Sequence, residues 1–181
     1  MAERQDFAPA RHLWKRTAPR AMIVLVALVV AVGGCKCKKT NPCDDNVAKD
    51  SQDQTAQSTT SVASHILASQ LIPSSSYTLC HIQVRLQADA GTSVTLKVVD
   101  NPVSWGTQYT SGTASVGSDP LVDISVNPYT VGKGLTYYIV LESASSTCQW
   151  TLCDLNGQNL EYGYEDGNQQ QGVYSYITYG Y

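Results

Sequence analysis

The sequence has little of what enzymes are built on. There are only three histidines in 181 residues, and neither His65 nor His81 lies in a GxSxG, HExxH or paired-carboxylate motif. Acidic residues such as Glu161 and Glu165 could flank a glycosidic bond, but they fall at the ends of expected hairpins, where carboxylates are ordinary turn residues. We therefore expect no enzymatic activity.

Positive charge is scarce after the first 34 residues. The remaining 147 residues contain seven basic and thirteen acidic side chains, a net charge of −6. Proteins that bind nucleic-acid backbones carry clusters of Lys and Arg, so this balance argues against nucleic acid as a partner. The length suits one domain and a linker better than two domains.

Long hydrophobic runs are absent except for Ala21 to Val32, which follows four basic residues. Counted to Cys35, the uncharged run would form a helix of about 22 Å, short of the ~30 Å hydrocarbon core of a bilayer. This length and the cationic approach are typical of a cleaved secretory signal peptide. An uncleaved signal anchor is the alternative. No twin-arginine pair precedes the run, so Sec export is expected.

The run ends in Val32-Gly33-Gly34-Cys35, which resembles the lipobox of bacterial lipoproteins. The resemblance implies that residues 1–34 are removed and that Cys35 is acylated. Two or three acyl chains give stable membrane anchoring, whereas one does not. Lys36 stands where an aspartate would mark inner-membrane retention in enteric bacteria. We therefore expect an exported protein, lipid-anchored in the cell membrane or, if the host has one, in the outer membrane.

Residues 35–60 read as a flexible, lipid-anchored linker. They are rich in Lys, Asp, Asn, Gln, Ser and Thr, and Val47 is their only large apolar residue. Such a segment cannot bury enough surface to offset the entropy of ordering. We expect the folded domain to occupy residues 61–181.

From Ser61 onward, short runs alternate between apolar and polar residues and are separated by turn residues. In Tyr77 to Gln87, for example, Cys80, Ile82, Val84 and Leu86 share one face. The other expected strands are 65–72, 92–99, 121–126 (stopped by Asn127-Pro128), 135–142, 147–153, and 160–164 paired with 173–179, while 103–111 is expected to be a loop. No segment has a 3.6-residue period, so the pattern predicts an all-β, antiparallel β-sandwich of about eight strands.

The stretches LTYYIVLES (135–143) and YGYEDGN (162–168), with a Tyr-rich last strand, resemble a jelly-roll module of bacterial extracellular proteins. The likeness covers about residues 64–181. The sequence departs from the family at two points: Tyr162 stands where a Trp is expected, and this part of the chain contains three cysteines. The family is a surface or adhesion-type accessory domain often suspected of carbohydrate binding, which implies a binding or structural role without catalysis.

If Cys35 is acylated, five cysteines remain, so at least one thiol is unpaired or pairs between chains. The preferred pairs are Cys37–Cys43 across a short loop and Cys80–Cys148 between inward-facing positions. The alternative for the second pair is Cys148–Cys153. A metal site at Cys35-x-Cys37 with Cys43 is disfavoured, because it lacks a fourth ligand and acylation would use the first.

Aromatic residues crowd the last two expected strands, and polar side chains lie beside them. Tyr rings that stack on sugars, next to groups that hydrogen-bond hydroxyls, suit glycan binding. Alternating Tyr is also good β-sheet material, so packing is the competing interpretation. The candidate ligand-binding residues are Trp105, Tyr162, Tyr164, Asp166, Asn168 and Tyr174.

We expect no cofactor, although a structural Ca²⁺ at the hairpin loops carrying Asp154, Asn156, Asp166 and Asn168 is conceivable. Two functions stay open. The first is a membrane-anchored, non-catalytic recognition module for glycans. The second is a structural or assembly lipoprotein that binds a protein partner in the envelope, through an exposed edge strand or an unpaired cysteine.

Overall fold

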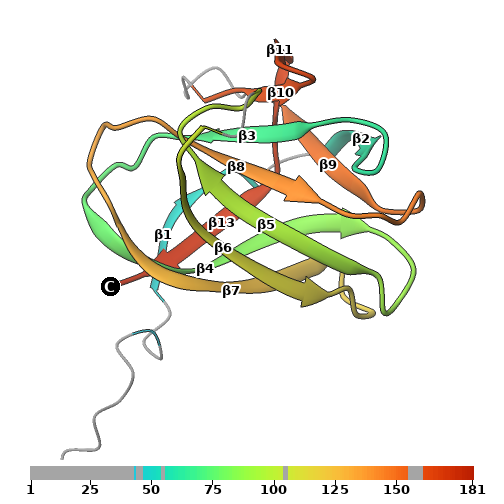
Figure 1. Cartoon of the computed structure of the whole chain (residues 1–181), viewed down its shortest axis with the longest axis horizontal. Coiled ribbons are helices and arrows are strands. Elements are labelled where there is room, and N and C mark those ends of the chain that lie inside the picture. The colour runs from blue at the N-terminus through green and yellow to red at the C-terminus, as the bar shows by residue number, and fades with distance from the viewer. Residues whose placement is uncertain (1–42, 44–46, 54–55, 104–105, 155–160) are drawn as a thin grey trace, which may run out of the picture. The chain divides into compact units, whose positions relative to one another are not determined.

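The described part of the chain forms two antiparallel β-sheets packed face to face, so the predicted all-β sandwich is confirmed (Figure 1). The computed structural model describes residues 43, 47–53, 56–103, 106–154 and 161–181. Thirteen strands and no α-helix are found there, more strands than the eight expected. All the strand pairs are antiparallel.

One sheet has six strands in the order β11-β10-β3-β8-β5-β6. Its strands are β3 (Leu67–Leu71), β5 (Ser93–Val99), β6 (Gln108–Ser115), β8 (Tyr137–Glu142), β10 (Gly163–Glu165) and β11 (Asn168–Gln169). The other sheet has seven strands in the order β1-β13-β4-β9-β12, with β2 on β9 and β7 on β4. They are β1 (Val47–Ser51), β2 (Ala56–Ser61), β4 (Tyr77–Gln87), β7 (Leu121–Val131), β9 (Gln149–Asp154), β12 (Gly172–Tyr174) and β13 (Tyr176–Gly180).

The core lies between the sheets and is built from alternate residues of each strand, as period-2 patterning requires. In β4, Ile82, Val84 and Leu86 are buried, as predicted. In β5 and β8 the inward residues are Val94, Leu96 and Val98, and Tyr137, Ile139 and Leu141. Thr95, Lys97, Tyr138 and Val140 therefore lie on the outer face of the six-stranded sheet.

Cys80 is buried as predicted, with 2% of its surface exposed, but it does not belong to the main hydrophobic cluster between the sheets. The β4–β7 register shifts between Leu79 and His81, and Leu79 joins that cluster. A bulge reverses the alternation on one side of itself, which a strict period-2 reading does not anticipate. The same irregularity lets β7 run through Pro128, where the sequence predicted a stop, because Pro is tolerated at bulges.

The folded domain begins before residue 61. β1 pairs with β13 and β2 pairs with β9, so residues 47–51 and 56–60 belong to the sandwich and the prediction of a linker there is wrong. These polar strands are held mainly by backbone ladders at the sheet edge and need no hydrophobic pattern of their own. Residues 35–42 lie outside the described part of the chain.

Two further expectations fail locally. The predicted loop 103–111 ends early, because β6 begins at Gln108. The predicted pairing of 160–164 with 173–179 does not form: β10 pairs with β3 and β11, whereas β12 and β13 pair with strands of the other sheet. The short connection between β10 and β12 does not determine which sheet each strand joins.

Candidate functional site

The outer face of the six-stranded sheet carries a second, smaller apolar cluster. Ala68, Val99 and Val140 are fully buried, and Tyr138 and Tyr164 pack against them while remaining partly exposed. The register explains the grouping, because Tyr164 lies opposite Ala68 and Ala68 lies opposite Val140. We call these five residues the outer-face cluster; Tyr138 and Tyr164 are the members that have exposed surface.

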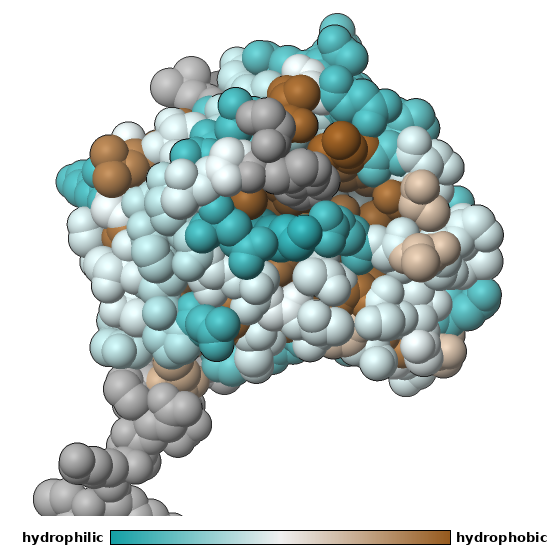
Figure 2. Space-filling model, viewed as in Figure 1, coloured by the Kyte–Doolittle hydropathy of each residue, from teal (hydrophilic) through white to brown (hydrophobic). Residues whose placement is uncertain are grey.

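The two tyrosines of this cluster form an edge-to-face pair, with ring centroids 5.5 Å apart and ring planes at 81°. Partial burial raises the pKa of Tyr164 above its ordinary value, and the neighbouring Tyr138 adds to this. The Tyr164 hydroxyl therefore stays protonated at neutral pH. In Figure 2 the hydrophobic residues visible on the molecule gather towards the end that carries β10 and β11, with hydrophilic residues around them.

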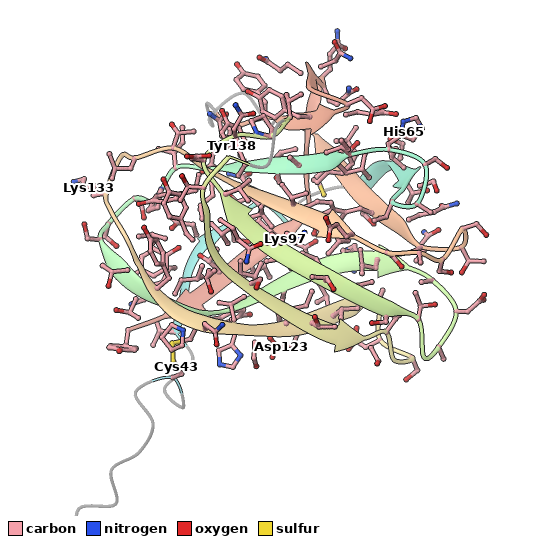
Figure 3. All side chains as sticks on the ribbon, viewed as in Figure 1. Cys43, His65, Lys97, Asp123, Lys133 and Tyr138 are labelled. Carbon is pink, nitrogen blue, oxygen red and sulfur yellow. A yellow bond between two sulfur atoms is a disulfide. The ribbon has the colours of Figure 1, made fainter. Side chains whose placement is uncertain are left out.

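The β10–β11 turn is fixed to the start of β3 by one carboxylate. Asp166 accepts a hydrogen bond from the Ile66 backbone N–H at 2.8 Å and lies 2.8 Å from Nδ1 of His65, which is also 3.2 Å from Glu165 (Figure 3). Asp166 adopts a φ of 50°, a left-handed conformation that Asp tolerates better than most residues. The hydrogen bond between His65 and Asp166 raises the pKa of His65 and lowers the pKa of Asp166.

Four of the six predicted ligand-binding residues lie in the β10–β11 hairpin or directly before it. Tyr162 and Tyr164 are partly exposed, and Asp166 and Asn168 are exposed. The backbone of Tyr162 is held by Gln70, whose N–H donates to the Tyr162 carbonyl at 2.9 Å. Trp105 lies outside the residues that the structure describes.

Tyr174 was predicted to bind ligand, and this prediction is wrong. Its side chain is fully buried and stacks on Trp150, with centroids 5.0 Å apart. Burial raises the pKa of Tyr174 to about 12. Residues 172–176 are all buried, so this segment has no exposed face on which alternate side chains could contact a ligand. Packing, the competing interpretation of the Tyr-rich strands, holds for Tyr174 and for the equally buried Tyr176.

Tyr138 and His65 belong to this region but are not among the residues predicted from the sequence. The signal for Tyr138 was present, because alternation in 137–142 places one of two adjacent tyrosines on the outer face. No local signal links His65 to Asp166, because the two residues are 101 positions apart.

The disulfide predictions are also corrected. Cys43 is bonded to Cys80. Cys148 is a buried thiol, so neither the Cys80–Cys148 pair nor its Cys148–Cys153 alternative forms. Cys37–Cys43 is excluded as well, since Cys43 is already used. Burial raises the pKa of the Cys148 thiol.

The oxygen-rich loops that suggested calcium are only partly described. Asn156 lies outside the described residues, and the carboxylate of Asp166 is engaged by His65 and Ile66. Within the described ranges, no three His, Cys, Asp or Glu side chains are grouped as metal ligands. In the same ranges no helix is long and apolar enough to cross a membrane.

Comparison with known proteins adds no family. No protein-family model matches the chain, and no curated protein matches it significantly.

Proposed function

We propose that this protein is a lipid-anchored envelope protein that displays a non-catalytic β-sandwich for binding glycans. The observation that carries the recognition role is the Tyr138–Tyr164 pair, partly exposed on the outer sheet face, with Tyr164 in the same hairpin as the exposed Asp166 and Asn168. Aromatic faces stack on the apolar face of a sugar, and carboxylate and amide groups hydrogen-bond its hydroxyls.

Export is supported by the Cys43–Cys80 bond, because structural disulfides persist in oxidising compartments outside the cytosol. The signal-peptide pattern of residues 1–34 points to the same route. Acylation of Cys35 is the step that turns an exported domain into an anchored one.

The disulfide makes the tether short. Seven residues separate Cys35 from Cys43, and at about 3.5 Å per residue the chain between these two cysteines reaches at most about 28 Å. Cys43 lies at the lower end of the domain and β10 and β11 at the upper end (Figures 1 and 3). The outer-face cluster is thereby presented on the half of the domain away from the attachment point.

A protein-assembly role has less support. The exposed large hydrophobic residues of the described chain are Val47, Val103, Leu135 and Tyr181, and none lies on a strand of the six-stranded sheet. The described strands of the six-stranded sheet therefore present half-buried tyrosines and no large exposed aliphatic side chain, although the exposed Val103 lies beside Gly167 of the β10–β11 turn.

The anchor is tested by intact mass spectrometry of membrane-extracted protein beside a Cys35→Ser variant. We expect a chain that begins at Cys35 and carries added acyl mass, and we expect the variant to lose both features. A full-length, unmodified chain in the membrane fraction would refute the lipoprotein assignment.

Recognition is tested on a glycan array with Tyr138→Ala and Tyr164→Ala, with Tyr181→Ala as an exposed aromatic control. Each cluster variant should weaken binding about tenfold, equivalent to about 1.4 kcal/mol, while the control binds normally. Melting temperatures identify any variant that fails by unfolding, and Tyr164→Phe retains the ring for comparison. Unchanged binding in both cluster variants would exclude this face as the site.

A further inference from the structure

A second concave region lies on the other sheet, where the end of β4 meets β9. It is a hollow of about 340 Å³, a size in the lower range of small-molecule sites. Its lining includes Ser58 and Thr59 from β2, Arg85 and Gln87 from β4, Thr151 from β9, and Pro120 before β7. Polar side chains from three adjacent strands therefore converge on one space.

The guanidinium in this hollow is held in a fixed position. Nε and Nη2 of Arg85 donate to the two carboxylate oxygens of Asp53 at 2.8 and 2.6 Å. Asp53 also accepts a hydrogen bond from the fully buried Ser175 hydroxyl at 2.7 Å. Such bidentate pairing leaves the remaining N–H groups of Arg85 in a rigid fork.

Arg85 is exposed enough to reach a ligand. Its side chain is 32% exposed, whereas that of Asp53 is 11% exposed. Asp53 therefore acts as the buried support and Arg85 as the group that faces the hollow. A preorganised donor of this kind loses little conformational entropy when it binds a ligand.

The charge of the site selects the chemistry of the ligand. The positive charge of Arg85 is balanced by Asp53, and Asp119 also acts on Arg85 electrostatically. A free anion would add negative charge to a region that has no excess of positive charge. The amide of Gln87 instead supplies both a donor and an acceptor, and the Thr59 hydroxyl, which donates to Gln149 at 2.6 Å, can still accept a hydrogen bond.

We propose that this hollow binds a neutral, hydroxyl-rich small molecule of about one sugar ring, with Arg85 as its principal hydrogen-bond donor. Pro120 and Ala56 supply apolar contact for the C–H groups of the ring. The site is separate from the outer-face cluster, which lies on strands of the other sheet. Refuting glycan binding at the outer-face cluster would therefore not refute binding in this hollow.

The test is saturation-transfer NMR and calorimetry on the full chain, extracted in a detergent without a sugar head group. The probes are glucose, galactose, mannose and N-acetylglucosamine, with acetate and gluconate as anionic comparators. Arg85→Lys keeps the charge next to Asp53 but removes the planar fork. Thr59→Val removes a hydroxyl that lies on the same sheet face as Arg85 and keeps the size of the side chain, on a strand position that suits β-branched residues.

We expect at least one neutral sugar to bind with millimolar affinity, and each variant to weaken that binding tenfold or more. The control is Thr113→Val, an exposed hydroxyl-to-methyl change on β6 of the other sheet, which should bind like the unmodified chain. Tyr138→Ala and Tyr164→Ala should also leave this binding unchanged, which separates the hollow from the outer-face site.

Three results would overturn the proposal. They are the absence of binding to every neutral probe, binding of the anions in place of the sugars, and sugar binding that survives both Arg85→Lys and Thr59→Val. If Arg85→Lys lowers the melting temperature, the Thr59→Val result decides.

Discussion

At the scale of single residues, Glu161 is the clearest case of a side chain whose environment controls its chemistry. Its side chain is 7% exposed, and its carboxylate accepts hydrogen bonds from the Ile72 N–H at 2.6 Å and from the Gln52 side chain. Burial raises the pKa of Glu161, and the charge of Asp50 raises it further, against the opposing effect of the hydrogen bonds. Glu161 thereby connects the ends of β1 and β3.

Because the pKa of Glu161 is higher in the folded than in the unfolded chain, its ionised form opposes folding at neutral pH. This penalty falls as the pH drops through the pKa of Glu161 in the folded chain towards 4.5. Acidification therefore makes the contribution of Glu161 to the free energy of unfolding more favourable to the folded state. In Glu161→Gln this pH dependence should disappear. Chemical denaturation of both chains between pH 7 and pH 4.5 measures the difference; parallel curves would contradict it.

The other titratable groups near Glu161 are Asp50, Tyr77 and Tyr176. Burial raises the pKa values of both tyrosines, so they stay neutral across this range. As a control for the hydrogen bonds, Glu161→Ala should lose about 1–3 kcal/mol of folding free energy at every pH, because it leaves buried donors without an acceptor.

The His65–Asp166 pair gives a second residue-scale prediction. Its hydrogen bond raises the pKa of His65, so the contact stabilises the fold at low pH and is lost as the pH rises through the folded pKa of the imidazole. Asp166→Asn should bring the His65 pKa back towards 6.5, as followed by NMR titration of the ring. Asn tolerates the left-handed backbone of Asp166, so the turn itself should survive. An unchanged His65 titration would show that Asp166 does not control it.

At the scale of elements, the Cys43–Cys80 bond links the segment before β1 to β4 across a sequence separation of 37 residues. Disulfides of this kind restrict the unfolded chain and typically contribute about 2–4 kcal/mol. The double variant Cys43→Ala, Cys80→Ala should lose that amount in denaturant titrations. Adding reductant should lower the stability of the unmodified chain to the same level and leave the variant unchanged; a variant as stable as the oxidised chain would contradict this.

The close approach of β6 and β7 depends on one glycine. A Cβ added to Gly112 would lie 2.0 Å from the carbonyl oxygen of Ser125, so Gly112→Ala must push the strands apart. We expect a loss of about 1–3 kcal/mol, as for other overpacked sites. The matched control is Gly117→Ala, where nothing lies within 4 Å of an added Cβ. Equal thermal stability of the two variants would refute this account of Gly112.

At the scale of the whole molecule, the N-terminal strands complete the sandwich. A chain shortened to residues 61–181 lacks β1 and β2 and loses the Asp53–Arg85 pair and the disulfide. We expect it to aggregate or to lack the near-ultraviolet circular dichroism of packed aromatics. A chain starting at Cys37 should melt cooperatively. Folding of the shorter chain with an equal melting temperature would restore residue 61 as the domain boundary.

The sequence by itself determined the fold class and most core positions. Alternation in Tyr77 to Gln87 located a strand with its observed bounds, and Ile82, Val84 and Leu86 are buried as predicted. Such predictions succeed because the side chains of a half-buried strand reflect their burial locally, residue by residue. The same logic placed Tyr164, Asp166 and Asn168 near one another, since they belong to one short hairpin.

Only the tertiary structure decided the long-range pairings. Polar residues 47–51 and 56–60 look like a linker in isolation, but partner strands complete their backbone hydrogen bonds. Tyr174 is buried against Trp150 of another strand, which stacks on it, and Cys80 is bonded to Cys43 across a sequence separation of 37 residues. Local patterning records whether a side chain is buried, whereas its contact partner depends on how the two sheets close around it.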